Sequence, residues 1–127
     1  MATSEPGIDV SFTAAGTMAA KQFYIAKLSA ARTVDVTTAA TNQPIGVIQD
    51  NPASGAVSVR IFGIAKVVIG AAISTAGVKL VSDGSGRAIT AAAGAGTNNG
   101  YLGFALETSG AAGDVISVFV CPGFYQG

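Results

Sequence analysis

Two acidic residues at matching positions are the part of this sequence that most resembles catalytic machinery. Asp50 and Glu107 each close a short apolar run, and in both cases a small-residue turn and a β-branched run follow. Two carboxylates brought close together could act as acid and nucleophile in the hydrolysis of a glycoside. Acidic residues at hairpin ends, however, are more commonly solvated turn residues. We therefore interpret Asp50 and Glu107 as turn residues and predict no enzymatic activity.

The remaining chemical motifs are incomplete. The chain has no histidine, which excludes histidine-based triads, general bases and metal ligands. Its single cysteine, Cys121, can form neither an intrachain disulfide nor a cysteine-rich zinc site. Residues 83–86 read Asp-Gly-Ser-Gly, but they lack the repeated acids and closing glutamate of a calcium loop. Dinucleotide and phosphate-loop fingerprints are also missing, so we expect no cofactor and no metal.

Charge and hydropathy limit the possible partners. The 127 residues include seven basic and seven acidic side chains, with no run of either sign, which argues against a nucleic-acid partner. No apolar stretch reaches the length of a membrane span, and the first seven residues lack the basic region of a secretion signal, so we expect cytoplasmic synthesis and no membrane partner. Charged residues make up only 11% of the chain, and such a surface is poorly protected against association. We therefore expect other chains to cover part of it.

The elements that would position these residues are short strands. Residues 45–63 and 102–121 both have the pattern of a β-hairpin, either as an internal duplication or because hairpins share such features. About eight or nine strand-like segments recur at regular spacing, and no segment has helical periodicity over a helix length. The sequence predicts an all-β fold, a small β-barrel or β-sandwich, with residues 21–127 as a single β domain.

Three turns are predicted to depend on their residue type. Gly63 interrupts a long apolar stretch, which indicates a bulge or bend. Asp83 and Gly84 are typical of a tight turn with positive φ at the glycine, so Gly84→Val should impair folding. Gly113 closes the small-residue turn of the second hairpin. Residues 91–100 are only Ala, Gly, Thr and Asn, and we expect a mobile surface loop there.

The two ends of the chain carry sparse large apolar residues. Residues 1–20 are expected to be an extended N-terminal arm, in which Ile8, Val10 and Phe12 alternate with polar residues as in a strand. This strand could lie on its own β domain or add to the sheet edge of a partner. Phe124 and Tyr125 are expected outside any strand, where they would either pack on a partner or cap the end of the domain.

Several segments in order resemble the small capsid decoration (cement) proteins of tailed bacteriophages. The segments are 21–28, 44–55, 62–67, 83–88, 102–107 and 113–116. Members commonly have an acid after the glycine matched by Gly77, where this chain has Val78. The resemblance implies a β-barrel or β-tulip fold that binds the outer surface of an icosahedral capsid, often as a homotrimer, and clamps neighbouring major capsid subunits. Ile8, Val10, Phe12, Phe124 and Tyr125 are then the candidate contacts with the capsid or a neighbouring subunit.

Two other classes of protein remain open from the sequence. A head-fibre or tail-associated subunit differs from a cement protein only in its location on the virion. A carbohydrate-binding β module would need aromatic platforms, and the absence of tryptophan with only three tyrosines disfavours it.

Overall fold

The computed structural model confirms the all-β prediction and describes residues 7–52 and 54–127, so residues 1–6 of the predicted arm lie outside the described residues. Those ranges contain nine strands and no helix, and hence no helix able to cross a membrane. The strands are β1 (Gly7–Ala14), β2 (Ile25–Ala30), β3 (Thr33–Val36), β4 (Gly46–Ile48), β5 (Ala56–Val68), β6 (Lys79–Ser82), β7 (Ala88–Thr90), β8 (Asn98–Ala105) and β9 (Val115–Gln126).

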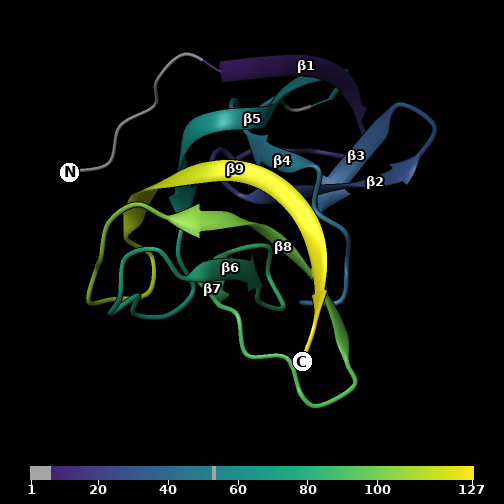
Figure 1. Cartoon of the computed structure of the whole chain (residues 1–127). Coiled ribbons are helices and arrows are strands. Elements are labelled where there is room, and N and C mark those ends of the chain that lie inside the picture. The colour runs from purple at the N-terminus through teal and green to yellow at the C-terminus, as the bar shows by residue number, and fades with distance from the viewer. Residues whose placement is uncertain (1–6, 53) are drawn as a thin grey trace.

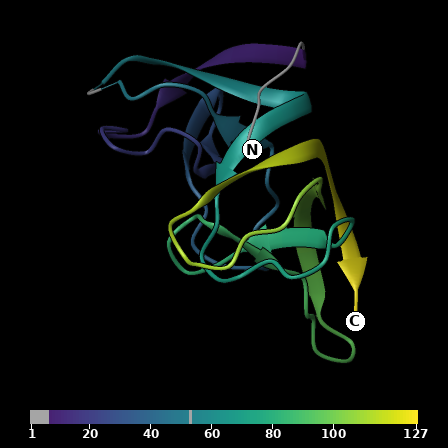
Figure 2. The ribbon, with the colours of Figure 1, turned by 90° about the vertical axis from the view of Figure 1, so that its left-hand side faces the viewer.

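All nine strands belong to one sheet, in the order β1-β3-β2-β4-β5-β9-β8-β6-β7. An additional pairing joins β1 to β5, so the first five strands in this order pair in a ring. The other four extend from β5 as a limb, and the sheet as a whole is not a closed barrel. Figures 1 and 2 show the ring strands above the limb strands, as two lobes joined through β5 and β9.

Each lobe has its own apolar core. The core inside the ring, which we call the ring core, consists of Met18, Ala26, Val34, Ile48, Val57 and Val59. The core of the limb, which we call the limb core, includes Ile25, Val47, Ala65, Val67, Ile69, Ile73, Leu80, Leu102, Ile116, Val118 and Val120. Successive residues of β2 and β4 enter different cores, as strand alternation requires. These two strands therefore separate the cores.

β5 is the strand that contributes to both cores along its length. Val57 and Val59 enter the ring core, whereas Ala65 and Val67 enter the limb core. Between them the β1–β5 register shifts, and Gly63 has a φ of 110°, a conformation that L side chains rarely adopt. The bend expected at Gly63 thus lies where β5 passes from one core to the other.

β1 lies on the protein's own sheet. It pairs antiparallel with β5 at seven positions, from Gly7 opposite Gly63 to Thr13 opposite Ala56. The Arg60 guanidinium holds this edge because its Nη2 lies 3.1 Å from Asp9 Oδ2 and its Nη1 donates to the Ile64 carbonyl at 2.7 Å. The hydrogen bond from Arg60 to Asp9 also raises the pKa of the guanidinium above its ordinary value.

The turn between β6 and β7 corrects the prediction for Gly84. Asp83 Oδ1 accepts hydrogen bonds from the backbone N–H groups of Ser85, at 2.8 Å, and Arg87, at 2.9 Å. Positive φ occurs at Gly86, with a φ of 83°, and not at Gly84. Longer hairpin loops place their left-handed residue after a first turn of ordinary φ, whereas the prediction placed it at the glycine of the Asp-Gly pair. The expectation of positive φ at Gly84 was therefore wrong.

The C-terminal aromatic residues are also in a strand, contrary to the prediction. Tyr125 pairs with Asn99 and Phe124 with Gly100, so β9 continues to Gln126 alongside β8. The end of the expected mobile loop is therefore ordered, and Asn99 is only 5% exposed. Gly100 permits this arrangement because a Cβ there would lie 2.1 Å from the Asn42 carbonyl oxygen. Backbone pairing between β8 and β9 builds this segment.

Candidate functional site

The two acidic residues that suggested catalysis each serve their own hairpin. Asp50 Oδ1 accepts a hydrogen bond from the Ser58 backbone N–H at 3.3 Å. Glu107 Oε1 accepts one from the Ser117 backbone N–H at 2.8 Å. Both carboxylates therefore tie the end of one strand to the returning strand. These contacts favour the interpretation of Asp50 and Glu107 as turn residues.

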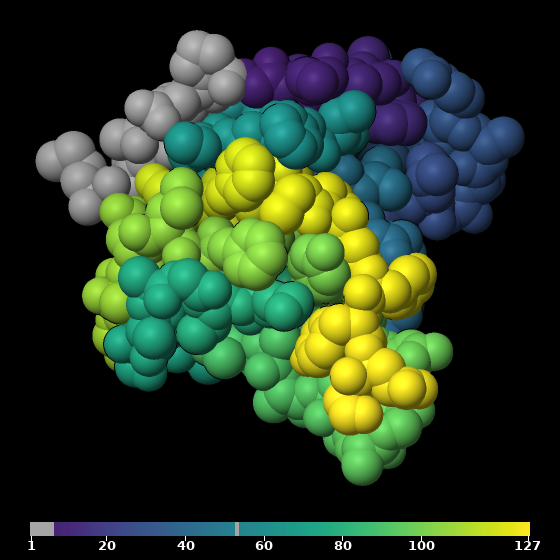
Figure 3. Space-filling view, in the orientation of Figure 1, coloured from purple at the N-terminus to yellow at the C-terminus, as the bar shows by residue number. Residues whose placement is uncertain are grey.

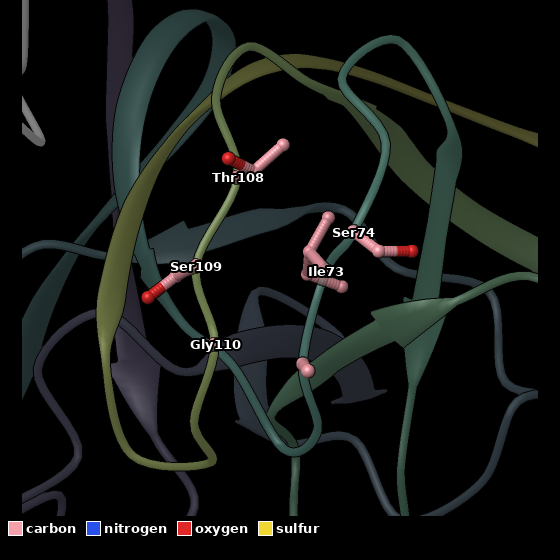
Figure 4. Close-up of a pocket in the computed structure, with 6 residues that line it drawn as sticks. Ile73, Ser74, Thr108, Ser109 and Gly110 are labelled. Atoms are coloured by element: carbon pink, nitrogen blue, oxygen red, sulfur yellow. The ribbon is translucent and has the colours of Figure 1, made fainter.

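A shallow hollow of about 280 Å³ lies between two loops of the limb (Figure 4). Ile73 and Ser109 join the loops through paired backbone hydrogen bonds of 2.9 and 3.0 Å. Figure 4 shows the hydroxyls of Ser74 and Ser109 pointing away from each other, and the Ser109 hydroxyl donates to Asp114. No charged side chain lines the hollow. The Ser109 hydroxyl is thus directed at Asp114 and not into the hollow.

In residues 7–52 and 54–127, no three acidic, cysteine or histidine side chains come together as a set of metal ligands. The carboxylate of Asp83, which suggested a calcium loop, is used within its own turn. Besides its backbone bonds, its Oδ2 lies 3.1 Å from Arg87 Nε. The Asp83 side chain therefore stabilises the turn between β6 and β7.

An apolar row lies on the outer face of the sheet, away from the limb core. Strand register places Ile64 of β5 opposite Phe119 of β9. Phe119 in turn lies opposite Phe104 of β8, and Phe104 lies opposite Lys79 of β6. Their chain neighbours Ala65, Val118 and Ala105 are buried in the limb core, so alternation directs the row outward. Figure 3 shows β5, β9, β8 and β6 following one another across this face.

Exposed side chains widen this row into a surface that we call the outer apolar face. Phe62 is 48% exposed and packs edge-on against Phe119, with ring centroids 5.3 Å apart. Leu106, two residues after Phe104, is also exposed. The outer apolar face thus comprises Phe62, Ile64, Phe104, Leu106 and Phe119. Contiguous apolar surface of this kind marks interaction sites in soluble proteins.

Sequence reasoning did not single out the outer apolar face. The available signal was that β5, β8 and β9 carry large apolar residues at both odd and even positions. Phe119, for example, stands between the buried Val118 and Val120. A strand that is apolar on both faces needs a cover on each face. The described part of the chain supplies that cover on the core side only.

The residues predicted as contacts lie in two separate places. Ile8 on β1 and Phe124 near the end of β9 are 54% and 57% exposed. Figures 1 and 2 place these two strand segments at opposite ends of the molecule. Val10, Phe12 and Tyr125 are half-buried, and Phe12 packs against the ring core. The five residues therefore do not form one patch.

Cys121 on β9 is the only thiol, and burial raises its pKa above the ordinary value. A raised pKa leaves less thiolate at pH 8, so we expect iodoacetamide to alkylate the folded protein more slowly than the urea-unfolded chain. Rates measured from pH 7 to 10.5 should show a higher midpoint for the folded protein. Restricted access alone would lower the rate without moving the midpoint, which would contradict this prediction.

The outer apolar face is typical of a protein that associates with other chains. Comparison with known families shows which class of structural protein this is, because the model of the phage cement protein family matches residues 1–120. The protein is thus a structural component of the phage virion. The chain belongs to the phage cement protein family.

A solved structure has the same fold. The N base of the head fibre gp8.5 in bacteriophage phi29 superposes with a TM-score of 0.63 and 19% sequence identity, covering 90% of this chain and 95% of that chain. Comparison with curated proteins gives no match. The family match therefore carries the assignment, and the structural likeness supports the fold.

Proposed function

We propose that this protein binds the outer surface of an icosahedral phage capsid and stabilises the shell by bridging neighbouring major capsid subunits, without catalysing a reaction. The observation that carries this proposal is the match to the cement protein family over residues 1–120. A bridging protein needs at least two contact regions that face different subunits. The exposed Ile8 on β1 and Phe124 near the end of β9 would supply two such regions, since Figure 1 shows these two strand segments at opposite ends of the molecule.

We further propose that the part of the outer apolar face formed by Phe62, Ile64 and Phe119 joins copies of this chain into a homotrimer. Net charge is zero and charged residues are few, so little electrostatic repulsion opposes self-association. Three equivalent copies would also multiply weak capsid contacts through effective concentration. Sedimentation of the purified protein at micromolar concentration tests this assembly. A strict monomer that also binds capsids as isolated copies would contradict it.

The capsid contacts lead to a prediction for two point variants. Ile8→Ser and Phe124→Ser should each weaken capsid binding about tenfold, because each removes about 1.4 kcal/mol of apolar burial at the contact. The double variant should lose about a hundredfold, since the two sites are far apart and their effects should add. Co-sedimentation with capsids that lack the protein measures the affinities.

Leu28→Ser is the matched control, since Leu28 is similarly exposed, at 52%, and lies on β2 outside the proposed contacts. Circular dichroism should show that all variants remain folded. Full binding by the double variant would contradict these contact positions. Capsids whose thermal disruption is unchanged by bound protein would contradict the stabilising role.

A second candidate function is the base of a head fibre, which the fold shared with the phi29 head fibre base favours. In that role the bound domain would carry a projecting fibre, whereas a cement protein would lie on the shell and bridge subunits. A density map of the decorated particle separates these functions. Contacts with two capsid subunits support the cement role, and contact with one subunit below a projecting stalk supports the fibre base.

A further inference from the structure

A groove of about 390 Å³ lies beside the outer apolar face, where the row ends at Lys79. Phe104 and Tyr125 form its aromatic walls, and Lys79 and Thr90 add an ammonium group and a hydroxyl. Gly77, Val78 and Ala91 complete the lining. The volume falls in the range of small-ligand sites, about 300–1,000 Å³. The groove therefore combines apolar walls with a few polar groups, as small-ligand sites do.

The Lys79 ammonium is the distinctive group of this groove. Its Nζ lies 6.0 Å from the ring centroid of Tyr101, 5.8 Å from that of Phe104 and 5.9 Å from that of Tyr125. Three ring faces stabilise the cation. Across the described residues no carboxylate pairs with it and no acceptor takes a hydrogen bond from it. Its N–H donors are thus available to an anionic ligand.

We propose that this groove binds an acidic pyranose, such as a uronic acid residue of a surface glycan. The sugar carboxylate would accept charge-assisted hydrogen bonds from the Lys79 ammonium. The apolar C–H groups of the sugar would contact the aromatic walls Phe104 and Tyr125 beside the ammonium, while Thr90 would bond a ring hydroxyl. This binding function is separate from the capsid contacts at Ile8 and Phe124.

An extended peptide fits the groove less well, because no strand edge of useful length among residues 7–52 and 54–127 borders it. β7 has only three residues. The carbonyl of Ala88 already accepts the Gly70 N–H at 2.8 Å, and the Ala91 N–H donates to the Lys79 carbonyl at 2.9 Å. A peptide added as a strand draws its affinity from main-chain hydrogen bonds that these groups no longer offer. A ligand held by side chains therefore suits the site better.

Titration of the ¹⁵N-labelled protein with sodium glucuronate, glucose and sodium acetate at constant ionic strength tests this proposal. We expect glucuronate to shift the amide signals of Lys79, Thr90 and Tyr125 and to saturate at millimolar concentration. Glucose should bind at least about fivefold more weakly, since it lacks the carboxylate. Acetate should produce no saturable shift. Lys79→Met should lower the glucuronate affinity about tenfold.

Lys66→Met is the matched control, because Lys66 also lies over an aromatic ring, 5.6 Å from the centroid of Phe23, but outside the groove. It should bind glucuronate like the parent. Equal loss in both variants, equal affinity for acetate, or no saturable shift would overturn the proposal. Tighter binding of the peptide acetyl-Asp-Phe-amide than of glucuronate would also overturn it. Unchanged capsid binding by Lys79→Met would support the separation of the two sites.

Discussion

Replacing Gly86 by alanine is expected to lower the melting temperature by about 10 °C or more. Gly86 has a φ of 83°, which costs a residue with a Cβ about 1–2 kcal/mol. A Cβ there would also lie 2.0 Å from Val36 Cγ1. Relief of such overpacking typically costs another 1–3 kcal/mol, and each kcal/mol shifts the melting temperature of a domain of this size by a few degrees. The backbone cannot easily retreat, because the Gly86 carbonyl accepts the Ile25 N–H at 2.8 Å.

Gly84→Ala is the matched control two residues earlier in the same turn. A Cβ at Gly84 meets no atom within 4 Å, and the residue does not have positive φ. Its melting temperature should stay within about 2 °C of the parent, as for most surface substitutions. Thermal unfolding followed by circular dichroism compares the two variants. If Gly84→Ala proved the more damaging, the assignment of the left-handed position would be wrong.

Deletion of residues 2–20 is expected to unfold the ring core rather than to release a dispensable arm. The deletion removes β1 and with it seven pairing positions on β5. It also removes Met18, which is 1% exposed, and Phe12, which packs against the same core. These two side chains contribute about 1.5–3 kcal/mol each, against a total stability of about 5–15 kcal/mol. Hydrogen exchange should show lost protection in β2, β3 and β4.

Deletion of residues 2–6 provides the comparison, since it leaves β1 complete. This shorter deletion should keep the protection of β2, β3 and β4. An arm that served only to reach a neighbouring subunit would give a different result, because the longer deletion would then leave that protection unchanged. Capsid binding by the 2–20 deletion is therefore informative only after exchange has shown which part of the protein is folded.

Local patterns allowed the fold class to be predicted, because strand periodicity and turn residues act over a few positions. The pattern of Ile8, Val10 and Phe12 predicted a strand, but its partner could not be inferred. Pairing between β1 and β5 joins residues about fifty positions apart, and no local pattern encodes it. The same limit hid the strand at Phe124, because Asn99 and Gly100 pair there through their backbones rather than through an apolar pattern.

The interaction surface was harder to predict than the strands. Alternation shows that Phe119 and Val118 face opposite sides of β9, but it does not show which side the limb core covers. The chain has only three tyrosines, and this small number disfavoured a carbohydrate-binding module in the sequence analysis. Their number mattered less than their position, since the fold brings Tyr101 and Tyr125 together with Phe104 around Lys79.

The passage of β5 through both cores has a mechanical consequence. A tensile load that enters at β1 and leaves at the end of β9 must pass through β5, because β1 and β9 both pair with it. β5 meets β1 over seven register positions and β9 over six. Tension along these strands shears the hydrogen bonds of each ladder together instead of opening them one after another. Each of the two ladders, β1–β5 and β5–β9, should therefore resist such a load until many of its hydrogen bonds break together.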